Sequence, residues 1–352
     1  MLNRVMNFCG HLPESAISPP ASGPRGGVVL ALLLLWSLTS VADEQSFRLL
    51  EGMSQALQQL NYRGELVYQS GGEIQSVRII HGFAPERASE YEMMESLNGP
   101  KRSVVRGEGA VHYALNGEPI ELQSGATLLP FKFSSVEDLQ RIEPYYQMRI
   151  EGKERIAGRD TIKLQVVPRD HYRYGFRLWI AEGSSMLLKS EMSNQQGEVL
   201  EGLMFTSLKL LPSLPQEFTL HNTLSPQQTP ERGAEQPGAK RSDGSSQSYR
   251  LQWQVATLPP GFSVVTARVE PHFVMEGREK VVEHHLYSDG IASVSLFIEG
   301  VTTGGEPEPG EISHLGAITM MTQSYDGYRA TVVGEVPPPT VLQIARSVVL
   351  RE

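Results

Sequence analysis

The stretch Tyr172-Arg173-Tyr174-Gly175-Phe176-Arg177-Leu178-Trp179-Ile180 decides the fold that we expect for this chain. Its apolar side chains recur with a period of two, which is the period of a β-strand. One face of such a strand carries Tyr172, Tyr174, Phe176, Leu178 and Ile180, and the other carries Arg173, Gly175, Arg177 and Trp179. The stretch therefore predicts a strand with one largely apolar face.

This pattern leaves two interpretations open. In the first, the apolar face packs into a core and the reverse face is solvated. In the second, Tyr172, Tyr174, Phe176 and Leu178 line a ligand cavity inside a curled sheet, because binding pockets are mostly apolar. Arg173, Arg177 and Trp179 would then contact a protein partner or an anionic head group.

Short strands joined by tight turns surround this stretch on both sides. The strands predicted are Arg63–Gln69, Glu73–His81, Lys101–Arg106, Ala110–Leu115, Tyr146–Ile156, Asp160–Val167, Met186–Ser193 and Val199–Leu210. So many short strands indicate one wide antiparallel sheet that curls.

Two helices are expected beside this sheet. Apolar residues recur every three or four positions in Gln45–Tyr62, which predicts an amphipathic helix that fills the concave side of the sheet. Ser134 and Glu137 have the spacing of a capping box, so a short helix is expected to run to Arg141.

A segment rich in Pro, Gln, Ser and Gly, Asn222–Ser248, divides the chain and is expected to be a flexible linker. After it come six predicted strands and a C-terminal helix, Val341–Leu350, capped by Thr340. The strands are Tyr249–Val255, Phe262–Val269, Val281–Tyr287, Ile291–Glu299, Ile318–Tyr325 and Tyr328–Glu335. The expected class is α+β with mainly β structure: a large N-terminal sheet, then a smaller antiparallel sheet with one packed helix.

The N-terminal part resembles an export signal. The apolar run Val28–Trp36 is too short to span a bilayer, and Ser40 and Ala42 occupy the positions that a signal peptidase reads. The predicted segments are a leader over residues 1–42, a first domain over 43–221, the linker over 222–248 and a second domain over 249–352. Cys9 is the only cysteine, so no disulfide is expected after cleavage, and a periplasmic location is expected.

No catalytic constellation stands out, and we expect neither an enzyme, a cofactor nor a metal site. His284 and His285 are neighbours on a predicted strand, so their imidazoles should point to opposite faces and not share one ion. Asp170-His171 is expected to be a polar loop. The net charge of −9 argues against nucleic acid as a partner.

Five blocks of this sequence recur in the same order in one known family. They are Tyr62-Arg63-Gly64-Glu65-Leu66-Val67-Tyr68, Pro168-Arg169-Asp170-His171-Tyr172-Arg173-Tyr174-Gly175, Leu258-Pro259-Pro260-Gly261-Phe262, Tyr287-Ser288-Asp289-Gly290 and Val332-Val333-Gly334-Glu335-Val336-Pro337. With these blocks the chain resembles the RseB/MucB family of regulators of the periplasmic envelope stress response. The resemblance implies a first domain like LolA and LolB, a half-open barrel around helices, and a second domain that helps to hold the partner.

The partner that the resemblance implies is the periplasmic domain of an inner-membrane anti-sigma factor of the RseA or MucA type. Binding would shield that domain from proteolysis, and lipopolysaccharide or the acyl chains of mislocalised lipoproteins would loosen the complex. A periplasmic lipid or lipoprotein carrier is the alternative, and a homodimer is left open.

Overall fold

The computed structural model describes residues 44–107, 110–116, 118–120, 136–218, 250–273, 279–300, 310–325 and 327–351. The predicted leader, the linker Asn222–Ser248 and the capping residue Ser134 lie outside these residues. Within the described ranges, no helix combines the length and the apolar character that a membrane span requires.

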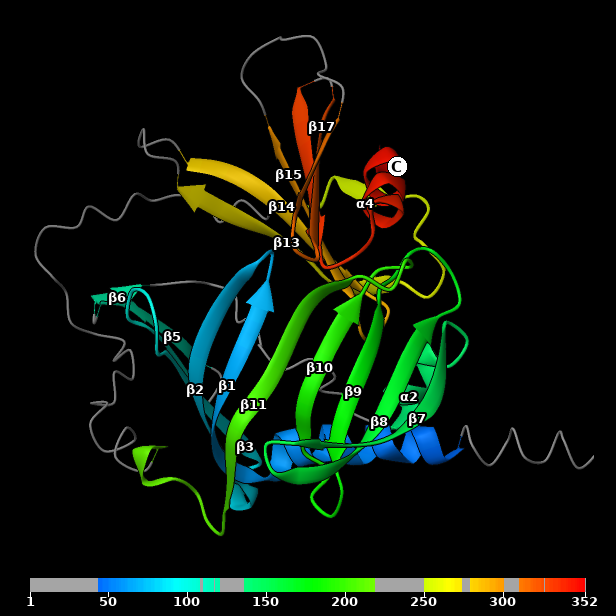
Figure 1. The fold of residues 1–352 in the computed structure, drawn as a ribbon. Coiled ribbons are helices and arrows are strands. Elements are labelled where there is room, and N and C mark those ends of the chain that lie inside the picture. Colours follow the sequence, from blue (N-terminus) through cyan, green and yellow to red (C-terminus); the bar gives the residue numbers. More distant parts are fainter. Residues whose placement is uncertain are drawn as a thin grey trace, which may run out of the picture. The chain divides into compact units, whose positions relative to one another are not determined.

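The first sheet has eleven strands in the order β6-β5-β4-β3-β2-β1-β11-β10-β9-β8-β7 (Figure 1). Every pairing is antiparallel, and β1 and β11, which are far apart in the sequence, pair at its centre. The order ends in β6 on one side and β7 on the other, so the described strands form an open sheet. The strands are β1 Asn61–Ser70, β2 Glu73–Ala84, β3 Ser89–Ser96, β4 Arg102–Gly107, β5 Ala110–Leu115, β6 Glu118–Ile120, β7 Tyr146–Ile156, β8 Arg159–Pro168, β9 Gly175–Ala181, β10 Leu187–Ser193 and β11 Val199–Leu211.

The N-terminal helix covers residues 44–59. Its predicted stripe is confirmed, because Leu50, Met53 and Leu57 are fully buried in the same apolar cluster as the inward side chains of β8 and β9. The prediction that the helix runs to Tyr62 is wrong. Tyr62 belongs to β1, where it pairs with residues of both β2 and β11. Pairing on two sides overrides the helical periodicity of the last turn.

Strand β3 was not predicted from the sequence, since Ser-Glu-Tyr-Glu-Met-Met-Glu-Ser carries three glutamates and glutamate is depleted in strands. Its Glu92 is 1% exposed and lies opposite Arg106 of β4, at 3.9 Å between the charged groups. A cross-strand charge pair therefore accommodates a residue that local preference disfavours.

The second sheet has six strands in the order β13-β14-β15-β18-β17-β16, and a separate two-stranded sheet pairs β12 with β19. These strands are β12 Trp253–Val255, β13 Ser263–Phe273, β14 Glu279–Ser288, β15 Ser293–Gly300, β16 Glu311–Leu315, β17 Ile318–Tyr325, β18 Tyr328–Gly334 and β19 Val348–Leu350. Helix α4, Pro338–Arg346, buries Val341, Ile344 and Ala345 in the same cluster as the inward residues of β15 and β18. In the first sheet, the short helix α2, Val136–Ile142, precedes β7.

Two details of the predicted C-terminal helix are wrong. The helix ends at Arg346, and Val348–Leu350 is a strand that pairs with β12. Thr340 is not the cap, since the N-cap is Pro337 and the helix begins with Pro338. Prolines have no N–H that needs a capping partner, so the hydroxyl of Thr340 is available for another contact.

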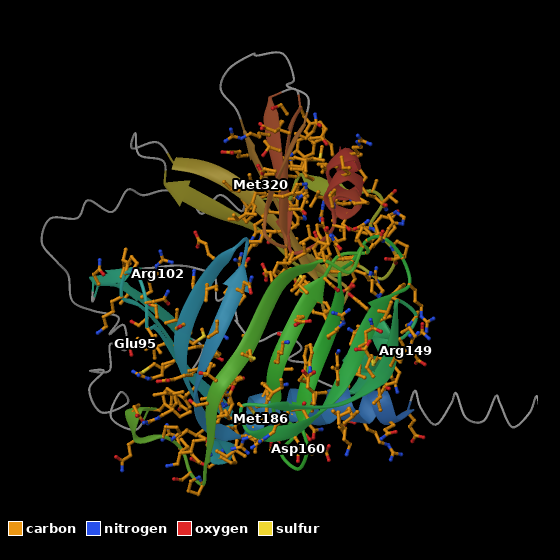
Figure 2. All side chains as sticks on the ribbon, in the orientation of Figure 1. Glu95, Arg102, Arg149, Asp160, Met186 and Met320 are labelled. Carbon is orange, nitrogen blue, oxygen red and sulfur yellow. The ribbon has the colours of Figure 1, made fainter. Side chains whose placement is uncertain are left out.

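Two methionines labelled in Figure 2, Met186 and Met320, differ in their burial. Met186 is fully buried, whereas Met320 is 41% exposed on β17. Met186 is ordinary core filling, whereas Met320 is a partly exposed side chain of the second sheet.

Candidate functional site

The inward side chains of the stretch 172–180 lie in the core of the first sheet. Strand β9 begins at Gly175, and Tyr174, Phe176, Leu178 and Ile180 are all less than 8% exposed in one apolar cluster. Tyr172 is not on this face. It precedes the strand and its ring contacts His171, with centroids 4.2 Å apart. A ligand role for the four predicted cavity residues stays a prediction.

Arg173 is placed differently from the sequence expectation. Its side chain is fully buried, although we expected it on a solvated face. The guanidinium lies over three aromatic rings, with its carbon 4.8 Å from the centroid of Tyr145, 5.4 Å from Tyr146 and 5.3 Å from Phe262. Phe262 precedes the second sheet, so Arg173 joins the two sheets instead of meeting solvent.

Charged and polar groups complete this contact, which we call the Arg173 joint: Tyr145, Tyr146, Asp170, Arg173, Pro260, Phe262 and Asp289. Arg173 Nε lies 3.3 Å from the Asp170 carboxylate, and Nη1 lies 3.4 Å from Asp289, whose side chain is also fully buried. Arg173 donates a hydrogen bond to the Pro260 carbonyl, and Tyr146 donates one of 2.9 Å to Asp289. The guanidinium and the Asp289 carboxylate therefore meet away from water, and the partly exposed Asp170 carboxylate approaches the guanidinium from one side.

Hydrogen bonds within local turns hold both carboxylates of the joint. Asp170 accepts a hydrogen bond from the Tyr172 N–H, a turn that ends β8 and points Arg173 away from the strand. Asp289 accepts hydrogen bonds from the N–H groups of Ile291 and Ala292, at 2.9 and 2.8 Å. The joint is thus preorganised by short segments of both sheets.

Gly261 is required at the turn that carries Pro260. Its φ of +83° lies in the left-handed region, and a Cβ at this position would lie 2.5 Å from the Tyr145 ring. Beside it, Thr340 of α4 donates a 2.5 Å hydrogen bond to the Tyr172 carbonyl. Both contacts bring backbone of one sheet close to the other.

The phenol of Tyr146 stays protonated in this environment. Burial, followed by the charge of Asp289, holds its pKa well above the ordinary value for tyrosine. The neutral hydroxyl can therefore act as a donor to Asp289 throughout the physiological range.

A second contact between the sheets centres on Glu201 of β11. Its carboxylate accepts 2.9 Å hydrogen bonds from Tyr68 and Ser70, and the Ala317 N–H lies 3.4 Å from it. Ala317, in the turn between β16 and β17, is fully buried in the core cluster of the first sheet. The sheets are thus fastened at two separated points.

The outward side chains of β9 are covered by neighbouring strands. Trp179 is 2% exposed and donates a hydrogen bond to Glu154. The ammonium groups of Lys163 and Lys189 lie over its ring, 5.1 and 4.2 Å from the centroid. The expectation that this indole meets a partner is therefore not supported by its exposure, because side chains of the same sheet cover it. Arg177 keeps 31% of its side chain exposed and lies 3.5 Å from Glu191.

The two adjacent histidines point to opposite faces of β14, as predicted. His284 stacks on Phe297 and lies 3.1 Å from the Ser295 hydroxyl, whereas His285 contacts Glu283 at 3.2 Å. Over the described ranges, no three metal-binding side chains gather into a site for an ion. Asp170 is engaged with Arg173, so the pair Asp170-His171 is not arranged as a catalytic dyad.

Sequence reasoning missed Tyr145, Tyr146, Pro260, Phe262 and Asp289 as members of one site. The turn signals Pro259-Pro260-Gly261 and Asp289-Gly290 were visible, but a turn signal does not tell which distant segment packs against it.

Both sheets of this chain have counterparts in known proteins. A family model described as the MucB/RseB N-terminal domain matches residues 45–231, and one described as the MucB/RseB C-terminal domain matches residues 247–349. The sigma factor AlgU regulatory protein MucB of Pseudomonas aeruginosa is 30% identical, over 90% of this chain and 96% of its own length. The sigma-E factor regulatory protein RseB of Haemophilus influenzae is 26% identical, over 91% and 96%.

Solved structures agree with the sequence comparison. The complex structure of Pseudomonas aeruginosa MucA/MucB aligns with a TM-score of 0.67 and 28% identity, covering 88% of this chain and 99% of that one. The crystal structure of MucB in complex with MucA(peri) aligns with a TM-score of 0.65 and 25% identity, over 87% and 99%. Matches to both family models, across both sheets, show that this chain belongs to the MucB/RseB family.

Proposed function

We propose that this protein is a negative regulator of an envelope stress response. It binds the periplasmic domain of an anti-sigma factor of the RseA or MucA type and shields it from regulated proteolysis. The observation that carries this proposal is the likeness, over 88% of the chain, to MucB in a solved complex with MucA. A shared fold over both sheets supports a shared mode of binding.

The contacts between the sheets favour regulation over simple carriage. A lipid carrier needs only an apolar face, which the first sheet could supply alone. Here buried ionic groups at the Arg173 joint and at Glu201 fix the second sheet against the first. A fixed pair of sheets offers a partner one continuous binding surface, which fits a protein that holds and protects another chain.

Location and release belong to the same proposal. The export signal at Val28–Ala42 supports a periplasmic location, where the anti-sigma factor domain would be met. Lipopolysaccharide or the acyl chains of a lipoprotein would release the partner by favouring a different state of the regulator, to the extent of their differential affinity.

The test is protection from proteolysis. The protein without its leader is mixed with the purified periplasmic domain of the anti-sigma factor, and the protease that first cleaves that domain is added. Cleavage should slow in proportion to the fraction bound. Unchanged cleavage at saturating protein would overturn the proposal, and transfer of a fluorescent lipopeptide between vesicles would then favour the carrier.

A further inference from the structure

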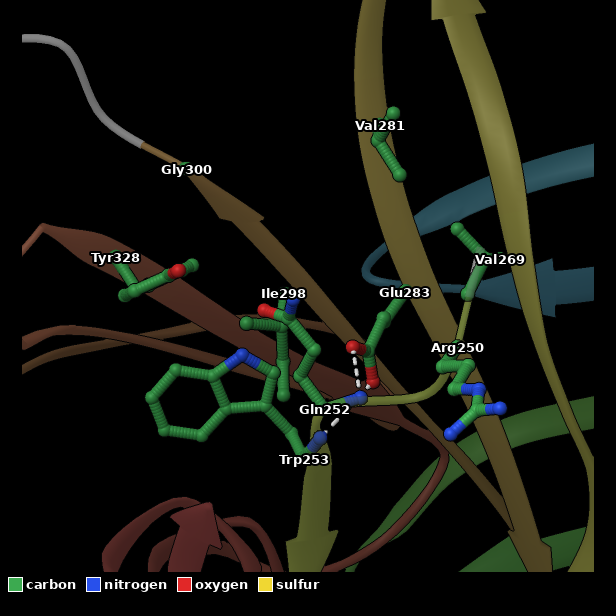
Figure 3. A pocket seen from close by; sticks show the side chains of 9 residues that line it. All are labelled: Arg250, Gln252, Trp253, Val269, Val281, Glu283, Ile298, Gly300 and Tyr328. Atoms are coloured by element: carbon green, nitrogen blue, oxygen red, sulfur yellow. Dashed lines mark hydrogen bonds between the residues drawn. The ribbon is translucent and has the colours of Figure 1, made fainter. Parts of the chain in front are cut away.

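The second sheet contains a half-open pocket with a volume of about 370 Å³ (Figure 3). None of its lining residues belongs to the Arg173 joint. Its apolar lining comes from Trp253 of β12, Val269 of β13, Val281 of β14, Ile298 of β15 and Tyr328 of β18. Pockets of this size are within the range that binds small ligands or single side chains. No role described so far uses these residues together.

The wall formed by β12 is preorganised. Glu283 of β14 accepts hydrogen bonds from the N–H groups of Gln252 and Trp253, at 2.5 and 3.2 Å (Figure 3). His285 also donates to this carboxylate, at 3.2 Å. The Trp253 indole packs edge-on against Tyr328, with centroids 4.8 Å apart. A ligand would thus meet an aromatic wall that needs little ordering on binding.

The polar groups of the pocket indicate the kind of ligand. Glu283 is the acidic residue of the lining, and its carboxylate is taken up by the two N–H groups and by His285. Arg250 lines the pocket and has no ion pair with another described residue, so its charge favours an anionic group nearby. The amide side chain of Gln252 supplies both a donor and an acceptor, which suits a peptide bond better than a hydrocarbon chain.

Gly300, at the end of β15, leaves one side of the pocket open. A Cβ at this position would have no atom of the described residues within 4 Å, so the backbone of a bound peptide can approach there. Any larger side chain at position 300 would project into free space instead of into the core.

We propose that this pocket binds one large apolar side chain of an acidic peptide, with Arg250 contacting a carboxylate beside that side chain. The inference rests on the proposed function, in which the bound anti-sigma domain supplies such a peptide. An anchor side chain in a preformed aromatic pocket is a typical hot spot of protein recognition. The pocket would thus give the second sheet a defined part in holding the partner.

Two variants test the pocket without disturbing the core. Gly300→Leu fills the open side, and Arg250→Glu reverses the charge at an exposed position. Arg102→Glu, an exposed charge reversal on β4 of the first sheet, is the matched control. The probe is the labelled periplasmic domain of the anti-sigma factor, and binding to the full exported chain is measured by fluorescence anisotropy.

Gly300→Leu and Arg250→Glu should each weaken binding roughly 10- to 100-fold, and Arg102→Glu should leave it unchanged. Wild-type affinity in both pocket variants would overturn the inference while leaving the proposed function intact. Circular dichroism that matches the wild type shows that the variants fold.

A second measurement is independent of the anti-sigma factor. Trp179→Phe leaves Trp253 as the single tryptophan after the leader, so its emission reports on the pocket. A short peptide with phenylalanine followed by two glutamates should change that emission, and the same peptide with serine for phenylalanine should not. A response to palmitate but not to the phenylalanine peptide would overturn the inference in favour of a lipid site.

Discussion

Arg173→Met is the change that most directly tests the joint between the two sheets. It keeps a long unbranched side chain among the rings of Tyr145, Tyr146 and Phe262 but removes the charge. Asp289, which is fully buried, then loses its counter-charge. The native hydrogen bonds from Tyr146, Ile291 and Ala292 to Asp289 remain, so the loss reports on what the guanidinium supplies: the ion pairs with Asp289 and Asp170 and the hydrogen bond to the Pro260 carbonyl.

The expected size follows from the geometry. Two unit charges 3.4 Å apart attract by about 5 kcal/mol at an effective dielectric constant near 20. In the native protein much of this attraction is offset by the cost of removing the guanidinium and the carboxylate from water. Removing one partner leaves that desolvation cost uncompensated, so Arg173→Met should lower the free energy of unfolding by about 3–5 kcal/mol.

A double-mutant cycle with Asp289→Asn measures the coupling itself. The two losses share one interaction, so the double variant should cost at least about 2 kcal/mol less than the sum of the single variants. Urea unfolding is followed by tryptophan fluorescence, since Trp179 and Trp253 report on the first sheet and on the β12–β19 sheet respectively. Arg177→Met is the control, because this half-exposed residue faces Glu191 at 3.5 Å and should cost less than about 1 kcal/mol. Additive losses, or an Arg173 variant as stable as the Arg177 variant, would refute this account of the joint.

Three further outcomes are expected. Burial raises the pKa of Tyr287 to about 12. The neutral phenol therefore stabilises the folded state fully below about pH 10, and this stabilisation is lost as the pH rises through about 12. Tyr287→Phe should flatten this alkaline decline in a pH series of thermal midpoints. Gly261→Ala should lower the thermal midpoint more than Gly327→Ala does. Both glycines have positive φ, but of the two only Gly261 has an aromatic ring of the described residues, that of Tyr145, within contact distance of a new Cβ. Equal shifts of the two thermal midpoints would contradict this. Thr340→Val removes the hydroxyl that donates to the Tyr172 carbonyl and should lower the free energy of unfolding in urea by about 1–2 kcal/mol. Thr340→Ser keeps a hydroxyl and should lose much less stability.

Elements whose signals are local could be predicted well. The helical stripe of Leu50, Met53 and Leu57, and the turn at Gly71-Gly72 between β1 and β2, follow from side-chain spacing and from the positive φ that glycine allows. Strands β5, β7 and β17 have the bounds expected from alternation. Strand β3 escaped prediction because its cross-strand partner, which makes Glu92 acceptable there, is not visible in its own sequence.

At the candidate site, too, local features could be predicted and contacts between distant segments could not. Alternation in 172–180 correctly separated the apolar residues Phe176 and Leu178 from the polar ones, and it placed them on the inner face of one strand. It could not tell what covers the opposite face, because period two describes a single strand and not its neighbours. Lysines of β8 and β10 cover Trp179, and Arg173 lies beyond the strand's start.

The sequence by itself determined the class of this protein: a mainly β chain with two antiparallel sheets, a helix with one apolar stripe and blocks that resemble one family. Only the tertiary structure decided that Arg173 is an internal counter-ion and not a surface contact. The physical reason is that a guanidinium is stable in either setting, exposed to water or buried between two carboxylates, and Asp289, 116 positions away, is brought to it by folding alone.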